Sequence, residues 1–194
     1  MEPILQSAET AMREAVGNLN CDHEPRGSSC VMKGGAPVEI RPIRPEDEPR
    51  MIQFHKGLSE RSVYMRYFES LSFGARTAHD RLSRICFADP ARETVLVALS
   101  NHSSGPKIVA VGRLSRLAHP MHAEVALLVL DELQARGLGT ELLRRLIDAA
   151  RAQKITRLEG EILRDNTAMQ RLLKKFGFQA RLIDPGCVRA TLTL

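Results

Sequence analysis

The stretch "LLVLDELQARGLGTELLRRLIDAA", residues 127–150, decides how the rest of the sequence is interpreted. Its apolar start is typical of a buried strand, and leucines at helical spacing follow. Gly137 and Gly139 stand between the two patterns. A helix N-terminus presents free backbone N–H groups and the positive end of the helix dipole, and glycine lets a phosphate approach the backbone closely. The turn therefore predicts either a pyrophosphate site or a tight turn that is only structural.

Two common phosphate-binding loops do not fit this stretch. No Gly-Lys-Ser/Thr follows the glycines, which excludes a Walker loop. A dinucleotide-binding fingerprint needs a third glycine where Leu142 stands, and the unit lies late in the chain instead of opening a βαβ repeat. The two glycines alone leave both interpretations open.

Composition indicates an ordinary globular protein with a mild positive charge. The 194 residues are 43% hydrophobic and 26% charged, enough for one domain with a well-formed core and an additional segment. The net charge of +5 suits an anionic ligand. With no Trp and only 4% aromatic residues, a base-stacking surface is not expected, so we expect no nucleic acid partner.

The cysteines and the N-terminus predict a soluble cytoplasmic protein. Four cysteines, at positions 21, 30, 86 and 187, show no CxxC spacing and are typical of reduced thiols. Cys21, His23 and Cys30 lack a fourth ligand at a suitable spacing, so no metal is expected. No signal-peptide pattern opens the sequence, and no apolar run reaches the length of a membrane span, so no membrane partner is expected either.

The chain is expected to divide near Pro37. Residues 1–37 read as a flexible arm, with a possible short helix over Glu2–Val16, because turn formers outnumber large apolar residues. Residues 38–194 predict one α/β domain with a mixed sheet. Strands are expected at 38–43, 94–100, 107–117, 122–132, 157–163, 178–183 and 188–194, and helices after Pro45, after a Ser59 cap, after a Thr77 cap, and at 139–154 and 166–176. Residues 94–117 predict a hairpin, and strand 122–132 should be central because both its faces are apolar.

Two motifs resemble those of the GNAT superfamily of acyl-CoA-dependent N-acyltransferases. "QARGLG" at residues 134–139 is similar to the Q/R-x-x-G-x-G/A signature, and "RDNTAMQRLLKKFGF" at 164–178 is similar to the second motif, an Asn that opens a helix ending in Gly-Phe. Together the motifs are specific, and the resemblance covers residues 38–194. Residues 40–68 also resemble the start of Pat-type protein lysine acetyltransferase domains. The resemblance implies the GNAT fold, a central mixed sheet with helices on both faces.

The resemblance also implies how acetyl-CoA would be held. Backbone N–H groups following Gln134 would bind the pyrophosphate; these belong to Ala135, Arg136, Gly137, Leu138, Gly139 and Thr140. Leu128, Val129 and Leu130 would pair with the pantetheine arm and bind the thioester carbonyl, which stabilises the oxyanion formed on amine attack. Asn166 would touch the pantetheine arm, although an Asn before an apolar helical run is also a standard N-cap.

Glu124 is the candidate general base. An amine attacks only when it is unprotonated, and Glu124 is the acid within the apolar part of the central strand, where we expect burial to make it a better base. The alternative is that Glu124 lies at the solvent end of the strand. His119 and His122, just before the strand, are rival candidates. Many GNAT enzymes have a Tyr that can protonate the leaving thiolate; the corresponding residue here is Leu173, so that acid is missing.

The acceptor is not fixed by the sequence. The Pat-type resemblance favours lysine side chains of a protein such as an acyl-CoA synthetase. A small amine or amino acid is the alternative substrate, and a non-catalytic acyl-CoA sensor is the alternative class. Acidic runs at Glu46–Glu48 and Asp131–Glu132 could attract a cationic lysine, but such runs are usually solvated. The oligomeric state is likewise open.

Overall fold

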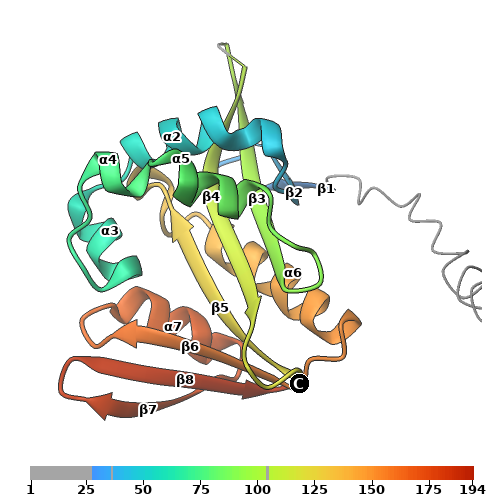
Figure 1. Ribbon diagram of the computed structural model, residues 1–194, viewed down its shortest axis with the longest axis vertical. Helices are drawn as coiled ribbons and strands as arrows, with labels where there is room; N and C mark the ends of the chain where they lie inside the picture. The colour runs from blue at the N-terminus through green and yellow to red at the C-terminus, as the bar shows by residue number, and fades with distance from the viewer. Residues whose placement is uncertain (1–27, 36, 104) are drawn as a thin grey trace, which may run out of the picture.

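A computed structural model of the chain describes residues 28–35, 37–103 and 105–194. In this part of the chain eight strands form one sheet in the order β1-β2-β3-β4-β5-β6-β8-β7 (Figure 1). The strands are β1 (Ser28–Val31), β2 (Pro37–Pro42), β3 (Glu93–His102), β4 (Gly105–Arg116), β5 (His122–Val129), β6 (Arg157–Leu163), β7 (Gln179–Asp184) and β8 (Cys187–Thr193). Neighbours are antiparallel except β5 and β6, which are parallel.

Helices cover both faces of the sheet (Figure 1). The described elements are η1 (Pro45–Asp47), α2 (Glu48–Lys56), α3 (Glu60–Tyr67), α4 (Phe73–Arg76), α5 (His79–Cys86), η2 (Asp131–Leu133), α6 (Leu138–Ala152) and α7 (Thr167–Lys175). Leucines of α6, including Leu142 and Leu146, pack in one core cluster with Val125 of β5. A second cluster joins Phe54 of α2 and Leu82 of α5 to the opposite face of the sheet. The mixed sheet covered on both faces confirms the predicted fold class.

The parallel pair β5 and β6 separates early. Only His122–Glu124 of β5 pair with Arg157–Glu159 of β6, although β5 continues to Val129 and β6 to Leu163. The other edge of β5 stays paired with β4 up to Val129. Figure 1 shows the two strands diverging beyond their paired start. The second half of β5 therefore presents an edge that no described strand occupies.

Several local predictions are confirmed. Strand 157–163 has the predicted bounds, and β3 and β4 form the predicted hairpin. Ser59 caps α3 by accepting a hydrogen bond from the backbone N–H of Ser62 at 3.2 Å. Asn166 caps α7, since its Oδ1 accepts from the backbone N–H of Met169 at 3.1 Å. These caps form because a short polar side chain satisfies an N–H that the first helical turn leaves unpaired.

The predicted Thr77 cap is wrong. Thr77 Oγ1 donates to the carbonyl of Phe73 at 2.7 Å and so belongs to the end of α4. The N-cap of α5 is Ala78, which offers no side-chain acceptor. A Thr followed by an apolar helical pattern does not reveal that another short helix ends on it.

The central residue of the acidic run at Glu46–Glu48 is not solvated, although Glu46 is exposed. Asp47 is fully buried, and Arg41 binds its two oxygens at 2.7 and 2.8 Å. Arg50 adds a third contact at 2.9 Å. Burial opposes ionisation, but hydrogen bonds from Arg41 hold the pKa of Asp47 below its usual value. Asp47 therefore fixes the connection between β2 and α2.

The expected arm must be shortened at its C-terminal end. Residues 28–31, placed in the arm by the sequence, form β1 and pair with β2. Met32 is 6% exposed within the α6 core cluster, and the Lys33 N–H donates to the Arg136 carbonyl at 3.0 Å. The domain therefore includes residues before Pro37. The short helix expected over Glu2–Val16 lies outside the described residues.

We expect Met32→Ala to lower the free energy of unfolding by about 2 kcal/mol or more, because it removes a buried side chain from a packed core. Val31→Ala is the matched control, since Val31 is 70% exposed; it should change stability by less than about 0.5 kcal/mol. Urea unfolding of both variants measures the difference. Equal stability of the two variants would contradict the assignment of Met32 to the core.

Candidate active site

The glycine-bearing turn opens into a cavity with a volume of about 900 Å³. We call it the large cavity. Its walls are the end of β5, the turn before α6, the first turn of α6, one side of α7 along its length, one side of α3 and residues 30–33. Predicted cofactor residues that line it are Leu128, Val129, Gln134, Ala135, Arg136, Gly137, Leu138, Gly139, Thr140 and Asn166. Elements far apart in the sequence thus bring both motifs to one space.

Leu130 is the one proposed cofactor residue outside this lining. Its side chain packs towards α2, and a Cβ built on Gly57 would lie 3.0 Å from Leu130 Cδ2. Its backbone N–H donates to the Val109 carbonyl at 3.0 Å, which continues the pairing with β4. Leu130 therefore anchors the end of β5 in the present conformation.

Glycine is needed at positions 137 and 139 for two different physical reasons. Gly137 precedes α6 with a φ of +96°, a backbone conformation that side-chain-bearing residues rarely adopt. A Cβ on Gly139 would lie 3.3 Å from Leu172 Cδ2, so this glycine allows α6 and α7 to approach closely. The first N–H groups of α6 have no acceptor within the helix. The turn thus combines a structural requirement with an exposed set of donors.

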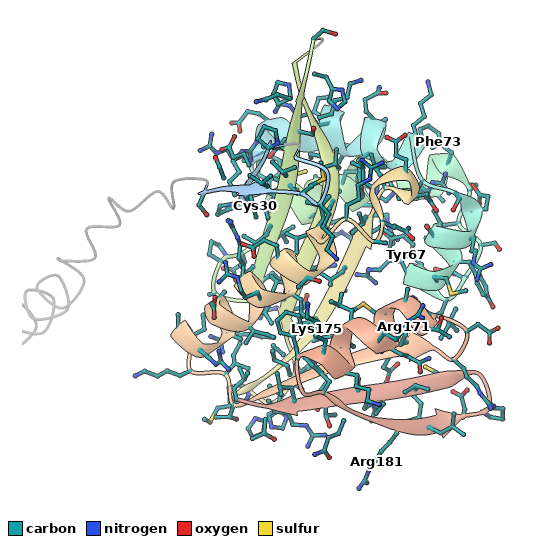
Figure 2. The ribbon with its side chains drawn as sticks, turned by 180° about the vertical axis from the view of Figure 1, so that it is seen from behind. Cys30, Tyr67, Phe73, Arg171, Lys175 and Arg181 are labelled. Atoms are coloured by element: carbon teal, nitrogen blue, oxygen red, sulfur yellow. The ribbon has the colours of Figure 1, made fainter. Side chains whose placement is uncertain are left out.

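Basic side chains exceed acidic ones in the large cavity. Lys33, Arg61, Arg66, Arg136, Arg171 and Lys175 line it, with Arg171 and Lys175 on α7 (Figure 2). The acidic lining residues are Asp131, Glu141 and Asp165. Hydrogen bonds from Arg144 and Arg145 lower the pKa of Glu141 to about 2, although burial acts in the opposite direction. The remaining positive charge favours an anionic ligand.

Asp131 and Gln134 attach α3 to the end of β5. Asp131 accepts hydrogen bonds from the Ser59 N–H at 3.0 Å and from the hydroxyls of Ser59 and Ser62 at 2.7 Å each. Burial acts against ionisation, but these hydrogen bonds hold the pKa of Asp131 below its usual value. Gln134 Nε2 donates to Ser62 Oγ at 3.2 Å and to the Val129 carbonyl at 3.3 Å. The Asp131 carboxylate is therefore already engaged and positions one wall of the cavity.

Glu124 does not lie in the large cavity, and the expectation that it is buried is wrong: the residue is exposed. It is the last residue of β5 that pairs with β6. Opposite residues of antiparallel strands share a sheet face, so Glu124, Ala126 and Leu128 lie on the same face as Arg113 of β4. His119 and His122 stack at 4.0 Å between ring centroids, at the start of the strand.

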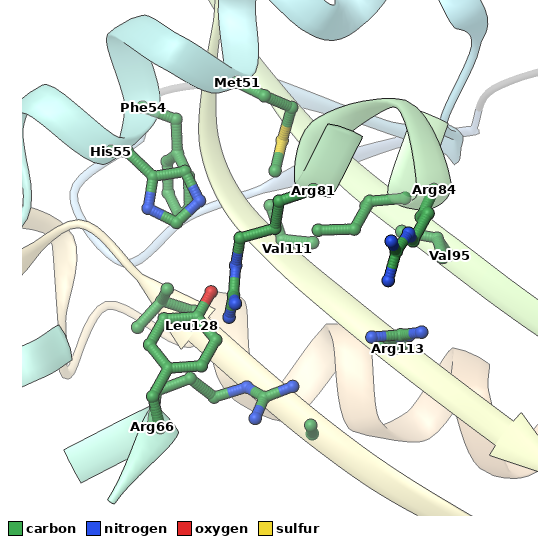
Figure 3. A pocket seen from close by; sticks show the side chains of 13 residues that line it. Met51, Phe54, His55, Arg66, Arg81, Arg84, Val95, Val111, Arg113 and Leu128 are labelled. Carbon is green, nitrogen blue, oxygen red and sulfur yellow. The ribbon is translucent and has the colours of Figure 1, made fainter. Parts of the chain in front are cut away.

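A second, smaller cavity of about 270 Å³ lies on that face. It is lined by residues of α2, α3 and α5 and of strands β3, β4 and β5 (Figure 3). Ala126 of β5 is among them. Arg66 and Leu128 line both cavities. The two spaces therefore meet at these residues, beside the strand that carries Glu124.

Leu173, which replaces the usual tyrosine, is 1% exposed in the α6 core cluster. It supplies no proton.

Among the described residues, no three His, Cys, Asp or Glu side chains gather as a metal ion would require, and no helix has the length and apolar character needed to cross a membrane.

Sequence reasoning missed most of the cavity walls. The sequence places residues 30–33 in the arm and marks no site residue on the helix after Ser59, yet Arg61, Met65 and Arg66 of α3 face the cavity. The repeated arginines at 61 and 66 were the available signal. Their position beside β5 depends on Asp131, whose contacts with residues 59 and 62 cross about seventy positions of sequence and leave no periodic pattern.

Comparisons with known proteins agree with this geometry. The family model described as an acetyltransferase (GNAT) domain matches residues 38–179. Acetyltransferase Pat of Mycolicibacterium smegmatis is 30% identical over 139 residues, which are 71% of this chain but only 40% of that protein. Acetyltransferase PA5475 of Pseudomonas aeruginosa is 29% identical over 144 residues, covering 74% of this chain and 76% of that protein.

Solved structures give the same result. The crystal structure of the GNAT domain of S. lividans PAT matches with a TM-score of 0.77 and 28% identity, covering 87% of this chain and 97% of that one. The PaiA N-acetyltransferase of Thermoplasma acidophilum, solved in complex with coenzyme A, shares the fold at 17% identity with a TM-score of 0.65, covering 81% and 99%. The chain belongs to the GNAT family of acetyltransferases.

Proposed function

We propose that the protein transfers the acetyl group of acetyl-CoA to a primary amine by direct attack of the amine on the thioester. The observation that carries this proposal is the coincidence, in one large cavity, of the unpaired half of β5 with the first turn of α6. The first offers backbone hydrogen bonds to an extended arm, and the second offers donors to a pyrophosphate. Acetyl-CoA carries both groups on one molecule.

In this proposal the backbone N–H groups of residues 135–140 bind the pyrophosphate, and Leu128 and Val129 receive the pantetheine arm. A backbone donor of this β5 segment polarises the thioester carbonyl and stabilises the oxyanion formed by attack. Arg171 and Lys175 of α7, together with Lys33, supply positive charge for the phosphates. Asn166 caps α7, so its side-chain oxygen is engaged and its contribution to the ligand would come from another group.

Glu124 is proposed as the base that accepts the amine proton. It lies four residues before Leu128, which is roughly 13 Å along an extended strand, so the proton would travel through water. Its exposure is compatible with such a route. The thiolate would recover a proton from solvent or from the attacking amine, because Leu173 has none to give.

For the acceptor we propose lysine side chains of a protein such as an acyl-CoA synthetase. The resemblance of residues 40–68 to Pat-type protein lysine acetyltransferase domains motivates this choice, and the similarity to the Pat acetyltransferases supports acetyl transfer in general. A small amine acceptor is the second candidate, and the specific observation in its favour is the small cavity with its four arginine side chains. A non-catalytic acyl-CoA sensor is the third possibility, and the proposed role of Glu124 as a general base counts against it.

Gly137→Asp should abolish acetyl-CoA binding, because a carboxylate would project into the proposed pyrophosphate site. A Cβ at this position meets no atom within 4 Å, so the side chain causes no clash in the free protein, although the φ of +96° strains the backbone. Gly137→Asn is the matched control, since it has the same backbone strain and nearly the same size without the charge. Calorimetric titration and the ligand-induced rise in Tm measure binding. Equal acetyl-CoA affinity in the two variants would exclude the pyrophosphate assignment.

Glu124→Gln should lower turnover by about 10²-fold or more while acetyl-CoA affinity changes little, because only the proton acceptor is lost. Raising the pH should recover part of the rate, since more of the amine is then unprotonated. The measurement is a pH–rate profile with a common acceptor. Glu159→Gln, opposite Glu124 on β6, is the control. Normal turnover in Glu124→Gln with a loss in His122→Asn would transfer the role to the histidine.

An acceptor screen tests the activity itself. Purified acyl-CoA synthetases and a panel of small amines are incubated with acetyl-CoA, and transfer is followed by mass spectrometry. Acetylated lysine on a synthetase supports the protein acceptor, and acetylated small amine supports the alternative. Tight acetyl-CoA binding with no transfer to any amine would favour the sensor.

A further inference from the structure

The small cavity of about 270 Å³ has an unusual lining. Four arginines reach it: Arg66 from α3, Arg81 and Arg84 from α5, and Arg113 from β4. Figure 3 shows their side chains converging on one space. None of its lining residues is an Asp or a Glu. We call this space the arginine cavity.

Only one of the four guanidinium groups has a carboxylate partner among the described residues. Arg113 Nε donates to Glu93 Oε2 at 3.1 Å, and the same two side chains make a second contact. Arg81 and Arg66 lie over the ring of Tyr67, at 4.7 and 5.1 Å from its centroid. Within the described residues, no salt bridge involves Arg66, Arg81 or Arg84. The cavity thus gathers three arginines whose charge no salt bridge of the described residues neutralises.

Two buried polar atoms on the cavity wall also lack hydrogen-bond partners. They are Nε of Arg81 and Nδ1 of His55, a residue that is 1% exposed. Leaving a buried polar atom unsatisfied is costly, so such atoms usually have a ligand or water partner. Burial and the charges of Arg76 and Arg81 lower the pKa of His55 to about 4, so its ring is neutral at pH 7. A neutral ring can donate one N–H beside the guanidinium groups.

The charges in the cavity repel one another. Burial lowers the pKa of Arg66, and the charges of Arg113 and Arg81 lower it further, against the opposing effects of Tyr67 and Glu124. An anion placed among these groups would reverse the repulsion and supply acceptors to the free donors. Planar guanidinium groups bind carboxylates particularly well, through paired hydrogen bonds.

The position of the cavity connects it to the transfer reaction. Leu128 and Arg66 belong to both cavities, and Ala126, which lines the arginine cavity, lies two residues from Glu124 on the same sheet face. A molecule held in the arginine cavity therefore lies beside the β5 segment that joins the proposed thioester site to the proposed base. This is where an acceptor amine must be oriented.

We propose that the arginine cavity binds a carboxylate group carried by the acceptor, so that the preferred substrates are amines with a nearby carboxylate. The inference rests on the proposed acetyl transfer. The carboxylate can belong to a free amino acid or to an Asp or Glu side chain close to a lysine in a protein. The chemistry at the arginines is the same in both cases, and the experiment separates them.

The first test measures anion binding without turnover. Glutarate, a small dicarboxylate, is titrated into the protein in the absence of acetyl-CoA. Wild type should bind it, and Arg81→Gln and Arg84→Gln should each weaken binding by about 10- to 100-fold. Arg84 is exposed, so its replacement keeps the test usable if Arg81→Gln fails to fold. Arg181→Gln, on exposed β7 (Figure 2), is the control that should bind normally.

The second test compares acceptors that differ only in the carboxylate. Lysine should be acetylated with a kcat/KM at least tenfold above that of cadaverine, and Arg84→Gln should remove this preference while leaving the KM for acetyl-CoA unchanged. Lysine peptides flanked by Glu or by Gln form the protein arm. A preference confined to free lysine identifies an amino acid substrate, and a preference for the Glu-flanked peptide identifies a protein segment.

The two tests fail in different ways. Absence of glutarate binding, or equal binding by wild type and Arg84→Gln, overturns the anion site. Equal kcat/KM for lysine and cadaverine, or a preference that survives Arg84→Gln, overturns its role in acceptor selection. Glutarate binding that depends on Arg84, with no acetyl transfer to any amine, contradicts the proposed activity and leaves the anion site standing.

Discussion

The separation of β5 from β6 is the constraint on which the rest of the site depends. Three residue pairs, the last at Glu124, join the two strands. Beyond them β5 stays paired only with β4, and β6 only with β8. Backbone groups that would be satisfied by a sheet partner become available to a ligand. The same divergence places the N-termini of α6 and α7 at one opening, because each helix connects to the diverging end of its strand. The large cavity results from this loss of pairing.

A second set of contacts completes the cavity from outside the sheet. The Asp131 carboxylate binds the cap residue of α3 and the serine one turn later, so the helix is fixed relative to the end of β5. Because Arg66 and Tyr67 lie at the other end of α3, their positions in the arginine cavity depend on that attachment. One exposed carboxylate thus influences both cavities.

The sequence predicted the fold and the cofactor motifs because those depend on short-range patterns. Leucines at helical spacing placed α6, alternating apolar residues placed the strands, and Gly137 and Asn166 marked two helix starts. It could not reveal which charged residues are buried. Asp47 stands in an acidic run and Glu124 in an apolar stretch, yet Arg41 and Arg50 enclose the buried Asp47, while Glu124 is exposed at the point where the strands separate. Such differences come from tertiary contacts, as does the incorporation of Met32 in the core.

The two cavities have separate linings apart from Arg66 and Leu128. If acetyl-CoA occupies the large cavity and the amine the arginine cavity, neither molecule has to leave before the other arrives. Direct transfer then takes place in a ternary complex, and initial-rate plots for the two substrates intersect instead of running parallel. Arg66, which both ligands would touch, is the residue through which occupation of one cavity can alter affinity in the other. Binding of the two substrates is therefore expected to be coupled, with each changing the affinity for the other by the same factor.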